Sequence, residues 1–257
     1  MTWDILHGGL GMPVALTLTA ISFASSMITA GLGIGGGAVM LAAMATLLPA
    51  PAIIPLHGLV QLGSNTGRAA LFFRDLHTGV VLPFLLGSLI GIAIGGAFVV
   101  QLDPGVIQIG LGLFILWTIV SRPPAFMRHS PAVTGGFSSF LTMFFGGTGP
   151  FVAAYVKTLE LGRVQHVATH ATLMTIQHLL KTIAFGLLGF AFSQWFGLIV
   201  LLIAFGFLGT VAGRHILLRI DEARFKIALN TILTLLALRL IYAGGMDLWR
   251  GKELAGG

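Results

Sequence analysis

Long apolar segments separated by short polar breaks run through almost the whole chain. We predict membrane-spanning helices near residues 13–30, 55–73, 78–100, 105–121, 131–145, 164–190, 194–213 and 225–244. Most of these segments have close to the ~20 residues that a helix needs to cross the hydrocarbon core. Inside lipid every backbone polar group must be satisfied within the segment, which helices achieve. The pattern therefore predicts an all-α integral membrane protein, a polytopic helical bundle.

Composition supports residence in a lipid bilayer. The 257 residues are 56% hydrophobic and only 9% charged, whereas a soluble domain carries roughly a quarter charged residues. The net charge of +6 comes from basic residues that lie mostly between apolar segments, where topology places them, so a nucleic-acid partner is not expected. The absence of cysteine excludes disulfides, thiolate metal sites and thiol nucleophiles. The start of the chain lacks the basic region and cleavage site of a signal peptide, so we expect the first apolar segment to be retained.

Two glycine-rich breaks interrupt the regular spacing of the spans. Residues 31–37 lead into a short apolar run, 38–48, and residues 146–150 lead into another, 151–159. Neither run is long enough to cross a bilayer. Each break therefore predicts a discontinuous helix or a re-entrant hairpin, which is tolerated only against protein or a water-filled cavity.

The two glycine-rich regions also align with each other. An offset of 113 residues superimposes Gly33 on Gly146, Gly36 on Gly149, His57 on His170, Arg68 on Lys181 and Phe72 on Phe185. We interpret this as an internal duplication within one transmembrane domain, 1–257, with a first repeat at 1–128 and a second at 129–257.

Charge predicts how the two repeats are oriented. Basic residues place the connections at Arg74, Arg122, Arg128, Lys157, Arg163 and 214–226 on the cytoplasmic side. The connections at Asp103 and 193–195 lack basic residues and are expected outside. The first half then starts outside and the second inside, so the repeats have inverted topology and both termini lie outside a bacterial inner membrane. Such an architecture places a substrate site at the midplane.

Each of two otherwise apolar helices carries a stripe of polar residues. The stripe of the first half is His57, Gln61, Asn65 and Arg68, spaced i, i+4, i+8 and i+11 on one helical face. The stripe of the second half is His170, Gln177 and Lys181, spaced i, i+7 and i+11, with His166 one turn earlier. Polar groups inside a membrane are costly and usually face a cavity or one another.

Neither stripe contains a carboxylate. The acids all lie in connections or near the ends of the chain: Asp4, Asp75, Asp103, Glu160, Asp221, Glu222, Asp247 and Glu253. A cavity lined by Arg, Lys, His and amides favours an anion. Backbone N–H groups of the glycine-rich breaks, at Gly35, Gly36, Gly37, Thr148 and Gly149, would add donors where the short helices begin. We predict that these residues and the two stripes bind substrate.

Structural roles are alternatives for the same residues. Arg68 can reach the cytoplasmic interface along its aliphatic stem, and Asn65 and Gln177 can join neighbouring helices. His57 and His170 can cap or pack helices. Further glycines, Gly87, Gly91, Gly95 and Gly96, predict a small-residue packing face, and the glycine-rich breaks can serve the same purpose. Arg239 and Tyr242 in the last helix are interpreted as residues of the membrane interface or of a homodimer contact.

Four features occur in order along the chain: Gly31–Gly37 after the first apolar helix, the proline-rich Pro49–Pro55, the polar-faced helix that follows, and Gly146–Pro150. Together they resemble the sulfite exporter TauE/SafE family along essentially the whole chain. The last motif, Gly-Gly-Thr-Gly-Pro, departs from a fuller glycine run. The resemblance implies a permease of small sulfur-containing or carboxylate anions, among them sulfite and organosulfonates.

We therefore expect an exporter that works by alternating access and has neither enzymatic activity nor a cofactor. Arg68 and Lys181 would supply charge at a midplane site, and histidine protonation would couple export to the proton gradient. One alternative is an intramembrane enzyme whose metal is held among His57, His129, His166, His170 and His178. The i, i+4 spacing of His166 and His170 suits a metal, but no acid lies nearby to act as a base. Another alternative is a passive anion channel, which also needs a polar path.

Overall fold

All the regular structure in the described residues is helical. The computed structural model describes residues 8–32, 35–99, 103–121, 124–128, 130–216 and 222–256. The helices are α2 (Met12–Leu32), α3 (Gly36–Leu47), α4 (Ala50–Leu71), α5 (Val81–Val99), α6 (Pro104–Val120), α7 (Pro131–Phe145), α8 (Gly149–Lys157), α9 (Arg163–Leu187), α10 (Phe196–Ile216) and α11 (Glu222–Gly256). Short 3₁₀ turns occur at Phe73–Asp75, Thr78–Val80, Ala125–Arg128 and Phe192–Trp195. The predicted all-α class is confirmed.

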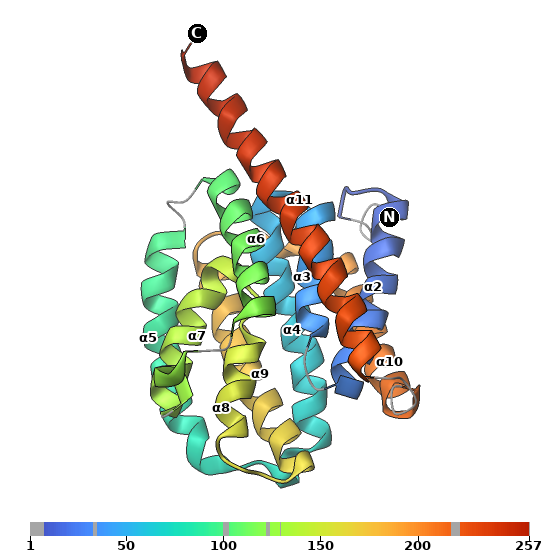
Figure 1. The fold of residues 1–257 in the computed structure, drawn as a ribbon, viewed down its shortest axis with the longest axis vertical. Coiled ribbons are helices and arrows are strands. Elements are labelled where there is room, and N and C mark those ends of the chain that lie inside the picture. Colours follow the sequence, from blue (N-terminus) through green and yellow to red (C-terminus); the bar gives the residue numbers. More distant parts are fainter. Residues whose placement is uncertain are drawn as a thin grey trace.

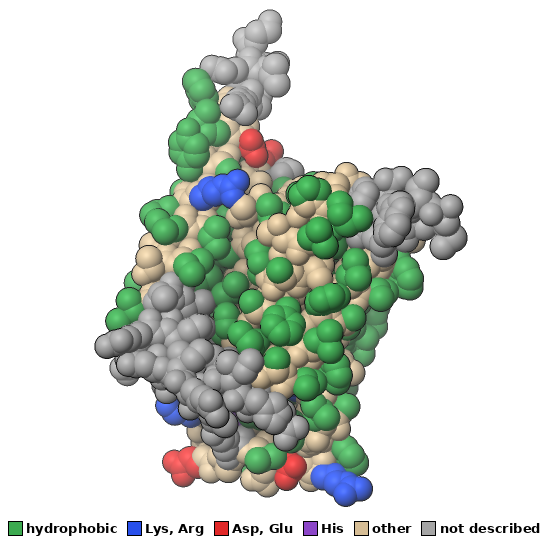
Figure 2. Space-filling model, turned by 90° about the vertical axis from the view of Figure 1, so that its right-hand side faces the viewer, with side chains coloured by type: hydrophobic (Ala, Val, Ile, Leu, Met, Phe, Trp, Pro, Cys, Tyr) green, Lys and Arg blue, Asp and Glu red, His purple; other side chains and the backbone are tan. Residues whose placement is uncertain are grey.

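Four helices are long and apolar enough to cross a membrane. These candidate spans are Met12–Ala30, Thr78–Val99, Phe192–Gly213 and Asn230–Trp249. Figure 2 shows a flank covered with hydrophobic side chains, while charged side chains lie toward the two ends of the molecule. The polytopic membrane architecture is thereby confirmed.

Two further helices are long but too polar to count as apolar spans. α4 has 22 residues and α9 has 25, which correspond to about 33 and 38 Å of helix. Both lie inside the bundle and cross each other. Many of their polar side chains are buried in the protein, among them Asn65, Arg68, Gln177 and Lys181.

The structure corrects two of the predicted helix boundaries. α4 begins at Ala50 rather than near 55, because Pro51 lies in the first turn, where a missing N–H breaks no helical hydrogen bond. α11 continues to Gly256 rather than ending near 244, and Figure 1 shows it projecting beyond the other helices.

Glycines bring neighbouring helices into close backbone contact. A Cβ added to Gly87 or Gly91 of α5 would overlap the carbonyl oxygens of Ala132 or Gly136 on α7. The predicted small-residue face on α5 is therefore a helix contact. Gly209 of α10 lies equally close to the carbonyl oxygen of Phe23 on α2. As a result α5 packs along α7, and α10 packs along α2.

Each glycine-rich break forms a hairpin. Gly35, at the start of α3, has φ 103°, and Gly146, at the end of α7, has φ 69°, both in the left-handed region that favours glycine. A Cβ on Gly36 would overlap the carbonyl oxygen of Ser25, so α3 turns back along α2. In Figure 1 α3 lies in the upper part of the bundle and α8 in the lower part.

The helices occur in two sets with the same order. α3 begins at residue 36 and α8 at residue 149, while α4 begins at residue 50 and α9 at residue 163. Each helix of the second set therefore begins 113 residues after its counterpart, which is the predicted offset. α2 begins and α11 ends toward the same end of the bundle (Figure 1). The division into inverted repeats at 1–128 and 129–257 stays a prediction.

Candidate functional site

The polar stripe on α4 is a chain of hydrogen-bonded side chains. His57 Nε2 lies 3.0 Å from the Gly37 carbonyl oxygen and 3.3 Å from Gln61 Nε2. Asn65 Nδ2 donates to the Gln61 carbonyl oxygen at 2.8 Å, and Arg68 Nη2 donates to Asn65 Oδ1 at 2.7 Å. Arg68 is only 6% exposed. Its guanidinium therefore lies within the protein and is directed back along α4.

The stripe on α9 is joined to α7 and to the start of α8. Gln177 Nε2 donates to Thr148 Oγ1 at 2.6 Å, and its Oε1 accepts from Ser138 Oγ at 2.9 Å. Lys181 Nζ lies 3.4 Å from Thr142 Oγ1. Lys181 is fully buried. Burying a lysine removes its ammonium group from water, which costs free energy unless polar or anionic groups lie next to it.

The two aligned histidines make the same kind of contact. His57 Nε2 meets the Gly37 carbonyl near the start of α3, and His170 Nε2 lies 3.3 Å from the Gly149 carbonyl at the start of α8. Each histidine thereby ties its own long helix to the short helix that follows a glycine-rich break.

The two stripes meet where α4 and α9 cross. A Cβ on Gly58 would lie 2.6 Å from Lys181 Cε, so glycine makes room for the lysine. The rings of His57 and His178 are edge to face, with centroids 6.0 Å apart. Lys181 is close enough to His57 for an electrostatic interaction, and Arg68 is similarly close to His170. Residues 57 and 58 lie beside 178 and 181, and Arg68, further along α4, is within electrostatic range of His170, earlier on α9, so the two helices run antiparallel.

Several buried polar atoms in this region have no hydrogen-bond partner. They include His57 Nδ1, Arg68 Nη1 and His178 Nδ1. Buried polar atoms are almost always paired in proteins, so each such atom calls for an explanation. A guanidinium N–H can only donate, so Arg68 Nη1 can bind an acceptor that enters the bundle, and His178 Nδ1 can do so in the tautomer that carries its hydrogen. The His57 ring donates from Nε2 to the Gly37 carbonyl oxygen, which leaves His57 Nδ1 as an acceptor.

No described carboxylate lies near the stripes to neutralise the two cations. The four acids whose side chains the structure describes, Asp75, Asp103, Glu160 and Asp247, are all exposed. Within the same described part, no three His, Cys, Asp or Glu side chains form a group that could hold a metal ion. The arrangement is a buried, cationic, donor-rich region between α4 and α9, suited to an anion.

Comparison with known families agrees with this geometry. The family model of the sulfite exporter TauE/SafE matches residues 18–240. The chain belongs to this family. The matched residues run from α2 to α11 and include both hairpins and both stripes. No curated protein and no solved structure matches the chain.

The structure adds three residues to the site predicted for this TauE/SafE member. Ser138 and Thr142 bind Gln177 and Lys181, and His178 lies beside His57. The internal alignment of the sequence contains a signal for these three residues. The offset of 113 residues also pairs Ser25 with Ser138, Thr29 with Thr142 and Asn65 with His178. Of the residues used in the alignment, Gly33 lies outside the described residues.

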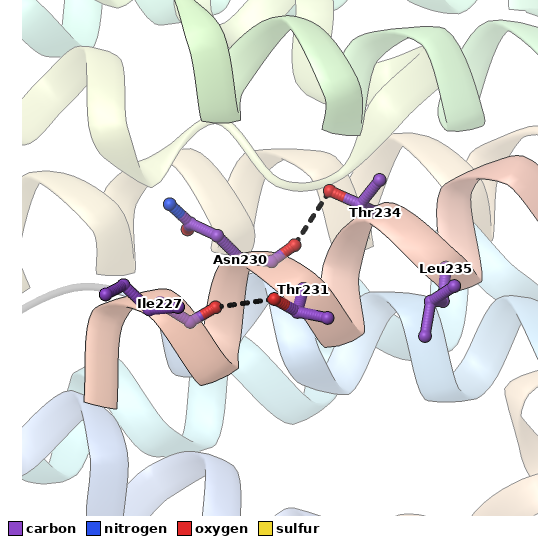
Figure 3. Close-up of a pocket in the computed structure, with 5 residues that line it drawn as sticks. All are labelled: Ile227, Asn230, Thr231, Thr234 and Leu235. Carbon is purple, nitrogen blue, oxygen red and sulfur yellow. Dashed lines mark hydrogen bonds between the residues drawn. The ribbon is translucent and has the colours of Figure 1, made fainter. Parts of the chain in front are cut away.

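An open groove on α11 is a different kind of surface. It is lined by Ile227, Asn230, Thr231, Thr234 and Leu235 (Figure 3). The two threonine hydroxyls donate to carbonyl oxygens of their own helix, at Ile227 and Asn230. The groove has no charged side chain among these residues and is not a candidate anion site. The homodimer contact predicted at Arg239 and Tyr242 stays a prediction; both side chains are exposed.

Proposed function

We propose that the protein exports a small oxyanion, sulfite or a related organosulfonate, through the polar region between α4 and α9. The observation that carries this proposal is the burial of two cations, Arg68 and Lys181, among hydroxyls, amides and histidines, with no described carboxylate nearby. Uncompensated charge is expensive inside a membrane and marks a pathway for substrate. Guanidinium, ammonium and imidazole donors form strong, charge-assisted hydrogen bonds with oxyanions.

We infer that transport proceeds by alternating access between two inverted repeats. Three features support this inference: the matched helix order, the position of α3 in the upper part and α8 in the lower part of the bundle (Figure 1), and the antiparallel crossing of α4 and α9. In such transporters the halves rock about a site at their interface. The interface here is the crossing at Gly58 and Lys181.

We infer also that the end of the bundle carrying Arg74 and Lys157 faces the cytoplasm, since basic connections are retained there. Both termini then lie outside. The absence of native cysteine makes single-cysteine variants unambiguous. In intact cells, Asp247→Cys should react with a membrane-impermeant maleimide, and Lys157→Cys should react only after permeabilisation. The opposite labelling pattern would contradict the orientation.

The transport assignment is tested with purified protein in proteoliposomes loaded with radiolabelled sulfite. Arg68→Gln and Lys181→Gln remove one buried donor charge each and should lower efflux at least ten-fold. Arg74→Gln removes an exposed charge outside the stripes and serves as the matched control. Wild-type efflux by both Arg68→Gln and Lys181→Gln would refute the assignment. Stimulation of labelled uptake by unlabelled sulfite on the other side identifies a carrier, and its absence a channel.

A further inference from the structure

The two buried cations lie at different depths along the crossing helices. Lys181 Nζ is beside Gly58, 3.4 Å from where a Cβ would lie there, and Arg68 Nη2 is hydrogen bonded to Asn65. Seven residues of α4 separate these two levels, which corresponds to roughly 10 Å of helix rise. Arg68 lies at the level nearer the 3₁₀ turn that contains Arg74.

Each level has its own cation, and each cation lies with a histidine from the other half of the chain, while His178 is within electrostatic range of both cations. Lys181 of the second half lies with His57 of the first, and Arg68 of the first half lies with His170 of the second. His57 Nδ1 is a buried unpaired atom at one level, and Arg68 Nη1 is a buried unpaired atom at the other. Both His57 and Arg68 are more than nine-tenths buried.

A small oxyanion cannot contact both levels at once. Its hydrogen bonds to nitrogen donors are about 2.9 Å long, and its own oxygens lie close together around one atom. A gap of roughly 10 Å between the two levels exceeds that reach. This spacing favours separate positions over one anion held by both Arg68 and Lys181.

We propose that the protein has two anion-binding positions in series, an Arg68 position and a Lys181 position, which can be occupied at the same time. The proposal rests on the proposed export function and specifies the number of anions that the pathway holds. Two unit charges roughly 10 Å apart, at an effective dielectric constant of about 20, repel enough to weaken the second binding step by about 15-fold. This repulsion would also favour release of the anion that arrived first.

The stoichiometry of binding tests the proposal. Radiolabelled sulfite is titrated into the purified full-length protein in detergent, and the bound anions per chain are counted. The wild type should bind two anions, with the second step about 15-fold weaker as a result of repulsion between unit charges. Arg68→Gln and Lys181→Gln should each bind one, and Arg74→Gln should bind two. Monodisperse elution and an unchanged unfolding temperature show that each variant is folded.

A second pair of variants keeps the test independent of the cations. His57→Gln should weaken only the Lys181 position, and His170→Gln should weaken only the Arg68 position. One anion bound by the wild type, or loss of all binding in either cation variant, overturns the two-position proposal alone. Absence of any sulfite binding by the wild type overturns the proposed function together with this inference.

Discussion

Replacing Gly58 with alanine changes the position of Lys181 without changing any charge. The new Cβ would lie 2.6 Å from Lys181 Cε, and ordinary contact begins at 3.4 Å. The lysine must therefore withdraw by roughly 0.8 Å, while its bond to Thr142, at 3.4 Å, is already at the limit of a hydrogen bond. A hydrogen bond to a charged group contributes about 1.5–3 kcal/mol. The displaced ammonium also loses its place beside the anion, and loss of one such bond to the anion corresponds to roughly a 10- to 150-fold weaker affinity.

Sulfite efflux from proteoliposomes, measured over a range of internal concentrations, should show this as a raised KM in Gly58→Ala. Gly67→Ala is the matched control, because it lies on the same helix and its Cβ would meet only the ring of Phe207, at 3.3 Å. Both substitutions gain about 1 kcal/mol of helix propensity. The difference in KM between the two variants therefore reports on the displacement of Lys181. A Gly58→Ala variant with the KM of the wild type would refute the placement of Lys181 in the pathway.

Two other substitutions test the hairpins. Gly36→Ala should destabilise the protein by about 1–3 kcal/mol, since its Cβ would overlap the Ser25 carbonyl and force α3 away from α2. Thermal unfolding in detergent measures this loss of stability. An unchanged unfolding temperature would contradict the close approach of α3 to α2. Thr148→Val removes the acceptor of Gln177 inside the protein and should cost about 1–3 kcal/mol. Thr175→Val, which breaks only a bond to its own helix, is the control for Thr148→Val and should change the unfolding temperature much less.

Most of the helices were predictable from the sequence because hydropathy and punctuation act locally. Helices end at the glycine-rich breaks before α3 and α8, where the chain turns, and at the polar breaks after α5 and α6, where it reaches water. The two boundaries that were wrong have local causes as well. Proline in the first turn of α4 does not interrupt a helix. The end of α11 is polar, and a helix that leaves the bilayer can continue in water.

The candidate site was predictable only in part. The spacing of His57, Asn65 and Arg68 predicted that they share a face, and the hydrogen bonds along α4 agree with that prediction. The partners on other helices were not predictable from spacing, because they depend on where α7 and α9 come to lie. Thr142 is an ordinary hydroxyl in the sequence and becomes part of the site only through its contact with Lys181.

The pairing of Lys181 with Gly58 has a consequence for the separate halves of this chain. Lys181 interacts with His57 from the opposite half, and Arg68 interacts in the same way with His170. The two long helices that carry them run in opposite directions. A polypeptide containing only the first half could form the equivalent pair, Arg68 with His57, only by associating with a copy inserted into the membrane the other way round. Fusing two halves into one chain removes the need for such dual insertion and holds the two orientations in a fixed one-to-one ratio.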